Sequence, residues 1–234
     1  MVAAGALRAL EALGPFFAVR THRDEPGPPW RPVSELVDDP AVLDERVRGV
    51  RARLAGERPA DDVELRVAAS VAQLGVVARL VSPVLAVAAV SGELVDADLR
   101  LLRWQDELGG AFPLSVPEAA GTAGPDVLAE RLLDGSVRQL VEATRPFSVA
   151  PRVLWGNVAS AVHGALGMVA DGLPQHAESA RAIGAELLER APLRGTGNLV
   201  DGEFHRRSCC LIYRAAPGRD GPVCGDCVLA GQAR

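Results

Sequence analysis

Apolar residues recur every three or four positions along most of the chain, which is the spacing of helices that bury one face. Asp39-Pro40 is typical of a helix start and Gly56 of a helix end, while Ser82-Pro83 predicts a break between two consecutive helices. Helices are therefore expected over residues 3–13, 39–55, 61–79, 82–92, 126–143, 151–170 and 174–190.

Other stretches depart from helical spacing. Apolar residues on both sides of Gly109-Gly110 predict a short β-hairpin near residues 99–116. Residues 21–34 are rich in proline and are expected to form an extended connector. Residues 203–213 are expected to be extended as well, and they lead into the first two cysteines of the chain.

All four cysteines fall near the C-terminal end, as the adjacent pair Cys209-Cys210 and in the run Cys224-Gly225-Asp226-Cys227. Thiols so close in sequence can converge on one centre, either zinc or an iron–sulfur cluster. The second pair has the spacing of a zinc knuckle, but adjacent cysteines must bend an extended chain to meet one ion. A cluster of two irons spreads its thiolates more widely, so the pattern favours an iron–sulfur cluster over zinc.

Two other uses of the thiols stay open. A redox dithiol at Cys224 and Cys227 would have the spacing found in thioredoxins, but no βαβ pattern precedes it. Disulfides would suit a secreted protein, yet Arg8 and Glu11 interrupt the apolar pattern where a signal peptide would be uncharged. We therefore expect a cytoplasmic protein, because that reducing compartment preserves thiol ligands.

The predicted fold class is mainly α with a small antiparallel β region, an α+β architecture. The length of 234 residues suffices for one core, or for one core with a small appendage. We predict a mainly helical domain over residues 1–196, including the hairpin, and a C-terminal cysteine-rich, cluster-binding segment over residues 197–234.

Residues 206–214 (Arg-Arg-Ser-Cys-Cys-Leu-Ile-Tyr-Arg) and 224–229 (Cys-Gly-Asp-Cys-Val-Leu) resemble the C-terminal signature of the FhuF-like ferric iron reductases, also called ferric-siderophore reductases. Residues 154–160 (Leu-Trp-Gly-Asn-Val-Ala-Ser) are similar to a second patch seen in that family. The resemblance is weak across the first half of the chain. The stretch between the cysteine pairs is longer than is usual in the family, and its Pro, Gly and Asp residues predict a surface loop.

The resemblance implies a [2Fe–2S] cluster bound by Cys209, Cys210, Cys224 and Cys227. It also implies one-electron reduction of a ferric chelate, in particular a ferric siderophore, with release of Fe(II). The sequence has no dinucleotide-binding Gly-x-Gly-x-x-Gly motif, so an electron donor protein or a diffusible reductant is the expected partner. The alternative is a zinc- or cluster-stabilised interaction module, or an iron-sensing module, without enzymatic activity.

The helix predicted over residues 151–170 is rich in small residues, and Asn157, Ser160 and Gly164 share one of its faces. One hypothesis is that this face seats the cysteine segment, with Asn157 donating to a backbone group near the cluster and Trp155 near the first turn. Close packing of one helix against another is the alternative.

Arg206, Arg207 and Arg214 lie within a few positions of the adjacent cysteines. Alternation along an extended segment places Arg207 on the same face as Cys209, and Arg206 on the same face as Cys210. A cluster becomes more negative on reduction, so a nearby cation would raise its reduction potential. We expect Arg207 to act on the cluster in this way, and Arg206 to bind an anionic chelate or an acidic donor protein. An ordinary solvated surface is the alternative.

Composition excludes several classes of function. The net charge is −5, all 25 basic residues are arginine, and no basic run is present, so nucleic acid is not an expected partner. The most apolar region, residues 63–95, is interrupted by Arg66, Arg79 and Pro83, so no transmembrane segment is expected. The motifs of serine hydrolases, P-loop NTPases and zinc metalloproteases are absent from the sequence.

Overall fold

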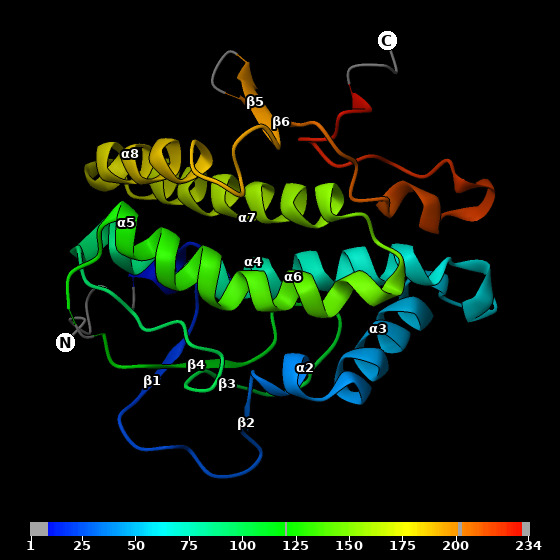
Figure 1. The fold of residues 1–234 in the computed structure, drawn as a ribbon, viewed down its shortest axis with the longest axis horizontal. Coiled ribbons are helices and arrows are strands. Elements are labelled where there is room, and N and C mark those ends of the chain that lie inside the picture. Colours follow the sequence, from blue (N-terminus) through cyan, green and yellow to red (C-terminus); the bar gives the residue numbers. More distant parts are fainter. Residues whose placement is uncertain (1–8, 120, 201–202, 231–234) are drawn as a thin grey trace.

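The computed structural model describes residues 9–119, 121–200 and 203–230. These residues are mostly helical, so the predicted α-rich class with a small β region is confirmed (Figure 1). The helices are α2 (Glu35–Asp38), α3 (Pro40–Ala55), α4 (Leu65–Ser91), α5 (Pro125–Leu128), α6 (Arg138–Thr144), α7 (Pro151–Gly172) and α8 (Ala177–Leu188). The shorter or irregular helical pieces are η1 (Ala60–Asp62), η2 (Ala129–Val137), η3 (Arg145–Phe147), η4 (Pro174–His176), η5 (Ile212–Ala215) and η6 (Pro217–Arg219).

Most predicted helices are present. Of the helix expected over residues 3–13, residues 9–12 are helical and residues 1–8 lie outside the described residues. α5, η2 and α6 follow one another without a gap and together match the helix predicted over residues 126–143. The helices predicted from residues 151 and 174 correspond to α7 and to η4 followed by α8.

α3 begins and ends where the sequence predicts. The Asp39 side chain accepts a hydrogen bond from the backbone N–H of Ala41 (2.9 Å), and Pro40 occupies the first turn. Gly56 follows the last residue with a positive φ of 62°, a conformation that glycine adopts without strain. The next helix, α4, starts at Leu65 rather than at Asp61, because η1 comes between them.

The predicted break at Ser82-Pro83 is wrong, because α4 continues through Pro83 to Ser91. A proline inside a helix removes one backbone hydrogen bond and costs about 3 kcal/mol. α4 packs against α3, α6, α7 and α8, and this burial on several sides offsets the cost. Ser82 does not cap a helix; its hydroxyl donates to the Ala78 carbonyl (2.7 Å). Gly92 ends α4 in the left-handed conformation, as predicted.

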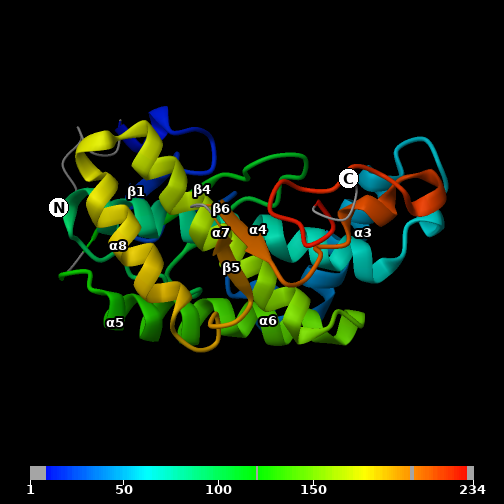
Figure 2. The same ribbon diagram turned by 90° about the horizontal axis from the view of Figure 1, so that it is seen from above.

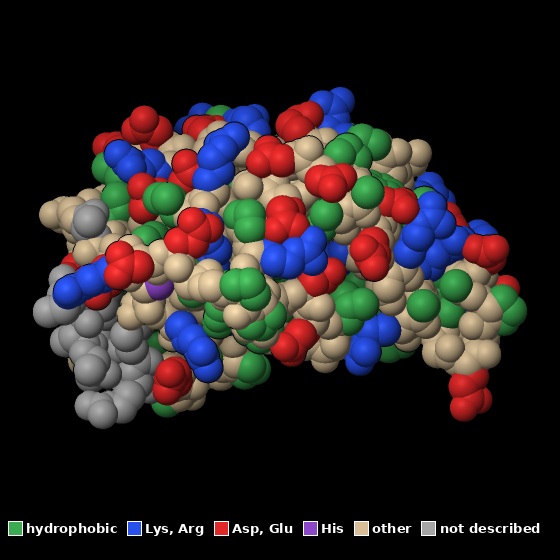
Figure 3. Space-filling view, turned by 90° about the horizontal axis from the view of Figure 1, so that it is seen from below, with side chains coloured by type: hydrophobic (Ala, Val, Ile, Leu, Met, Phe, Trp, Pro, Cys, Tyr) green, Lys and Arg blue, Asp and Glu red, His purple; other side chains and the backbone are tan. Residues whose placement is uncertain are grey.

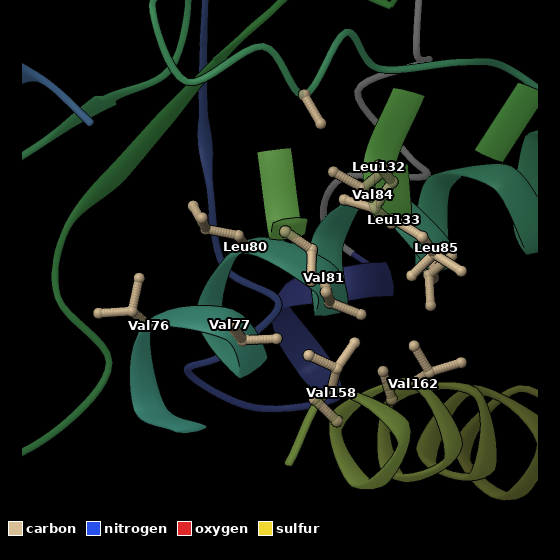
Figure 4. Packing of buried hydrophobic residues seen from close by; sticks show 14 of the residues in the cluster. Val76, Val77, Leu80, Val81, Val84, Leu85, Leu132, Leu133, Val158 and Val162 are labelled. Carbon is tan, nitrogen blue, oxygen red and sulfur yellow. The ribbon is translucent and has the colours of Figure 1, made fainter. Parts of the chain in front are cut away.

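The main core lies where α4 faces α7 on one side and η2 on the other (Figure 4). Fully burying each aliphatic side chain of this kind stabilises the fold by about 1.5–3 kcal/mol. The labelled members are Val76, Val77, Leu80, Val81, Val84, Leu85, Leu132, Leu133, Val158 and Val162. This packing holds α4 and α7 rigidly in place, so that segments packed on their outer faces are well positioned.

A four-stranded sheet has the order β1 (Arg20–His22), β4 (Leu114–Pro117), β3 (Arg103–Trp104) and β2 (Arg31–Pro32). β3 and β4 pair antiparallel, which confirms the hairpin predicted near residues 99–116. β2 also pairs antiparallel with β3, whereas β1 runs parallel to β4. Residues 21–34, predicted to be only a connector, therefore supply most of two short edge strands.

Arg79 joins α4 to the segments that precede β1 and β4. It is buried in the helix, and its guanidinium donates to the carbonyls of Phe16 (2.8 Å), Ala18 (2.6 Å) and Phe112 (2.8 Å). Burial lowers the pKa of Arg79 to about 10. The side chain stays charged near neutral pH, and its three bonds satisfy carbonyls that would otherwise be left without a partner.

By length and composition alone, α4 and α7 could each cross a membrane. Their most apolar windows are, however, 72% and 67% buried inside the fold, as expected for core helices of a packed protein. No clear transmembrane segment is therefore found among the described residues.

The C-terminal segment starts with an antiparallel pair, β5 (Gly197–Val200) and β6 (Glu203–Arg206). The extended conformation predicted over residues 203–213 ends at Arg206, because the chain then bends and Leu211 adopts a left-handed conformation (φ 74°) before η5. β6 contacts α7 and η5 contacts α4, so the segment lies over one end of the helical core (Figures 1 and 2).

Candidate metal centre

The C-terminal segment brings the four cysteines together as free thiols in two close pairs. Cys210 Sγ and Cys224 Sγ are 3.6 Å apart, and Cys227 lies near enough to Cys209 to contribute to the raised pKa of that thiol. Cys210 and Cys227 are each only 1% exposed, whereas Cys209 and Cys224 are partly exposed. The set therefore has a buried side and a side that reaches solvent.

Local turns produce this convergence. After the adjacent pair, the left-handed Leu211 turns the chain, and its backbone N–H donates to Cys209 Sγ (3.2 Å). At the second pair, the Cys227 N–H donates to the Cys224 carbonyl (3.1 Å), which closes a tight turn. The Leu229 N–H lies 3.5 Å from Cys227 Sγ. Backbone donors of this kind stabilise thiolates and tune the potential of a cluster.

These thiols fit a centre with two metals. Two sulfurs bonded to one tetrahedral metal at about 2.3 Å are about 3.8 Å apart, close to the separation of Cys210 and Cys224. Among the described residues, no three His, Cys, Asp or Glu side chains are arranged around a single ion. Two pairs of thiols match a [2Fe–2S] cluster, in which each iron takes two protein ligands.

Arg206 is the charged group closest to the sulfurs. Its side chain is 0% exposed, and Nη2 donates to Cys224 Sγ (2.6 Å). Nη1 donates to Asn157 Oδ1 (3.0 Å), and Nε forms an ion pair with Asp226 Oδ2 (3.0 Å). Burial alone would lower the pKa of Arg206, but Asp226 and the cysteines outweigh it and raise that pKa. The guanidinium is a fixed positive charge beside the thiols.

A buried polar network on α4 and α7 holds Arg206 in place. Asn157 Nδ2 donates to the Ser70 carbonyl (3.1 Å) and to Gln73 Oε1 (3.0 Å). Ser70 Oγ in turn donates to the Cys210 carbonyl (2.8 Å). Asn157 was expected to donate to a backbone group near the cluster; instead it accepts from Arg206 and donates toward α4. Polar residues inside the apolar stretch 63–95 were the sequence feature that could have revealed Ser70 and Gln73.

Two small residues of α7 allow the close approach of the segment. A side chain at Gly156 would place its Cβ less than 3.0 Å from Ser208 Oγ, which donates to the Arg152 carbonyl (3.0 Å). One turn further, the Ser160 hydroxyl donates to the Asp226 carboxylate. The hypothesis that the small-residue face of this helix seats the cysteine segment agrees with these contacts, which join α7 to both sides of the thiol set.

The remaining predicted site residues lie elsewhere. Arg207, expected beside the sulfurs, is exposed and donates to Asn198 Oδ1 (2.8 Å) in β5, so Arg206 takes the place foreseen for Arg207. Arg214 pairs with Glu64 (3.0 Å) at the start of α4. Trp155 faces α6, where the Arg138 guanidinium lies 5.3 Å from its ring centre. No contact of these three side chains with a cysteine thiol is found among the described residues.

The free thiols differ in acidity. The pKa of Cys210 falls to about 5, first because Cys224 donates a hydrogen bond to it and further because Arg206 is near. The same hydrogen bond raises the pKa of Cys224, and burial raises that of Cys209 to about 12. Cys210 is therefore the first of these three to become a thiolate, the form that binds metal.

Comparison with known families bears directly on this segment. Residues 206–229 match the family model described as the FhuF 2Fe-2S C-terminal domain. This part of the chain is similar to a FhuF-type C-terminal domain. The match begins at Arg206 and contains both cysteine pairs, so the resemblance drawn from the sequence is confirmed there. A domain of this family implies a [2Fe–2S] cluster, and the protein is accordingly an iron–sulfur, metal-binding protein. No curated protein matches the chain.

Proposed function

We propose that this protein is an oxidoreductase that transfers one electron from its [2Fe–2S] cluster to a ferric chelate, preferably a ferric siderophore, and so releases Fe(II). The observation that carries the proposal is the match of residues 206–229 to the FhuF domain, on a thiol set with one exposed side. Fe(III) held by hard oxygen donors is bound far more tightly than Fe(II), so one electron is enough to free the metal.

The buried and the partly exposed cysteines would have different roles around the cluster. A bound [2Fe–2S] cluster supplies single electrons, and such transfer requires no proton-transfer residue. Cys210 and Cys227 are buried, and the Cys210 carbonyl accepts a hydrogen bond from Ser70 of α4. Partly exposed Cys209 and Cys224 form the side at which a chelate would make contact. Substrate can approach this side without entering a deep active site.

One face of the molecule lacks the charge pattern of a nucleic-acid interface (Figure 3). Figure 3 shows one broad face of the molecule, on which acidic and basic side chains are interspersed over the described residues. A nucleic-acid interface gathers basic residues into a patch or stripe instead. We propose a cytoplasmic location. We also propose that electrons come from a donor protein or a diffusible reductant, because the sequence carries no nicotinamide- or flavin-binding motif.

Anaerobic reoxidation tests this function. Protein reduced with dithionite and freed of excess reductant would be mixed with ferric hydroxamates, ferric citrate and ferric catecholates, with ferrozine present to trap Fe(II). We expect hydroxamate and citrate complexes to reoxidise the protein in a single phase, with one Fe(II) trapped per reduced protein. Catecholate complexes should react least, because their potentials are lowest. A protein that stays reduced against the whole panel would instead be the iron-sensing module.

A further inference from the structure

The two close pairs of thiols are not equivalent. Arg206 donates to Cys224 Sγ (2.6 Å), and Cys224 Sγ lies 3.6 Å from Cys210 Sγ. The described side-chain contacts of Arg206 are with Cys224, Asn157 and Asp226, and none is with Cys209 or Cys227. The positive charge of Arg206 therefore lies beside the pair Cys210 and Cys224 and not beside the other two cysteines.

We propose that Cys210 and Cys224 bind the same iron, and that Arg206 directs the added electron to that iron. This assignment depends on the FhuF-type cluster but not on the identity of the chelate. A one-electron donor such as dithionite supplies the electron, one Fe(III) becomes Fe(II), and no bond is made or broken. The other iron, bound by Cys209 and Cys227, remains Fe(III).

Electrostatic interactions determine which iron is reduced. Reduction adds one negative charge to the cluster, and a cation stabilises that charge most where it is nearest and least screened. Arg206 is fully buried, so solvent ions screen it little. Hydrogen bonds to ligand sulfurs raise the potential in the same sense. The paired Asp226 opposes the effect, because its carboxylate lies 3.0 Å from Nε and carries a negative charge.

The two irons would have similar exposure to solvent. Cys224 is partly exposed, while Cys210 is bonded through its backbone to Ser70 in the core. In the other pair Cys209 is likewise partly exposed and Cys227 buried, so the charge of Arg206, and not exposure, distinguishes the two irons. Arg206 acts through the ligands rather than on substrate, which makes it a positioning residue for the electron.

Paramagnetic proton NMR of the reduced wild-type protein tests the assignment without any substitution. In a reduced [2Fe–2S] cluster, the cysteine β-protons on the Fe(III) and Fe(II) sites respond to temperature in opposite senses. With signals assigned through contacts to neighbouring residues, Cys210 and Cys224 should both behave as Fe(II) ligands, and Cys209 and Cys227 as Fe(III) ligands. Opposite behaviour within the first pair would overturn the shared iron, and Fe(III) behaviour of both would overturn the role of Arg206.

Substitution gives an independent readout in the reduction potential. Arg206→Gln should disfavour reduction about tenfold, which is about 59 mV for a one-electron couple. Arg206→Lys keeps the charge and should recover part of that shift. Arg207→Gln is the matched control, because Arg207 is exposed and bonds to Asn198; its potential should equal that of the wild type. Equal potentials in Arg206→Gln and Arg207→Gln would overturn the proposal.

If the Arg206→Gln variant fails to hold a cluster, Asp226→Asn provides a second test of the electrostatic effect. It removes the negative charge that opposes Arg206, so it should raise the potential. A lowered or unchanged potential in Asp226→Asn would contradict the electrostatic account, since a purely structural role of the ion pair predicts no rise.

Discussion

The helical core and the C-terminal segment are held together by different kinds of contact. Around α4 and α7, apolar side chains form one continuous cluster. The C-terminal segment adds Phe204 to that cluster and Ala215 to a small second one with Ala55, Val63 and Val67. It is otherwise attached through polar contacts, chiefly those of Arg206, Ser208, Asp226 and the Cys210 carbonyl.

The helical core therefore provides the stability of the fold, and the C-terminal segment provides the metal-binding chemistry. Many side chains share the packing of the core, so the loss of one leaves the fold intact at a cost of a few kcal/mol. The shape of the segment depends on a few polar contacts and on the metal it binds. Substitutions in the segment, or at the helix positions that support it, should therefore affect the cluster before they affect the helices.

The largest effect is expected from the ligands themselves. Cys→Ser at position 209, 210, 224 or 227 should each remove or strongly destabilise the cluster while leaving far-UV circular dichroism close to wild type, because the core does not depend on these thiols. Iron and sulfide content together with visible absorption measure the loss. A serine variant with a wild-type spectrum and full iron content would disprove its ligand assignment.

Asn157→Leu should come next, because it breaks the link between core and segment. The substitution leaves Arg206 Nη1 and Gln73 Oε1 buried without their partner, and each unpaired group costs about 1–3 kcal/mol. Urea unfolding and the rate of cluster loss measure both consequences. Asn198→Ala is the control at an exposed asparagine, with a change within about 0.5 kcal/mol. Similar effects of the two would mean that the buried network does not support the segment.

Two glycines of α7 provide a sharper test of the contact. Gly156→Ala should destabilise the segment by about 1–3 kcal/mol, because the new Cβ would displace Ser208. Gly164→Ala meets no atom within 4 Å and should stabilise the helix by up to about 1 kcal/mol. Thermal unfolding and cluster half-life distinguish them; the comparison fails if both variants change in the same direction.

The smallest effect is expected where the segment meets α4 at the surface. Arg214 donates to Glu64 and holds the pKa of that carboxyl below its usual value. A lowered folded-state pKa means that the pair stabilises the protein above the unfolded-state pKa and loses this contribution as pH falls through the folded-state pKa. Glu64→Gln should thus cost up to about 1 kcal/mol near neutral pH and nothing in acid. Unfolding measured across this range would show a constant difference if the pair were irrelevant.

The sequence predicted local features better than long-range ones. The Asp39 cap, the hairpin and the convergence of four cysteines depend on neighbours in the chain, and each was foreseen. Continuation of α4 through Pro83 depends on helices packed around it, which local preference does not reveal. The strands β1 and β2 are only three and two residues long, too short for an alternating pattern to stand out.

The arginines illustrate the same limit at the site. Alternation correctly separated Arg206 from Arg207 and placed Arg206 on the side of Cys210. It could not tell which side faces α7, because that depends on the close approach of Ser208 to Gly156. Arg206 is therefore buried against the thiols, and Arg207 points to β5.

The central claim is that a stable helical core carries one [2Fe–2S] cluster on its C-terminal segment. Anaerobically purified protein should be red-brown, contain two irons and two sulfides per chain as a [2Fe–2S] cluster requires, and give no EPR signal when oxidised. After dithionite, a spin-½ signal should integrate to one spin per chain. A colourless protein with stoichiometric zinc, or a reduced sample without that signal, would contradict the account.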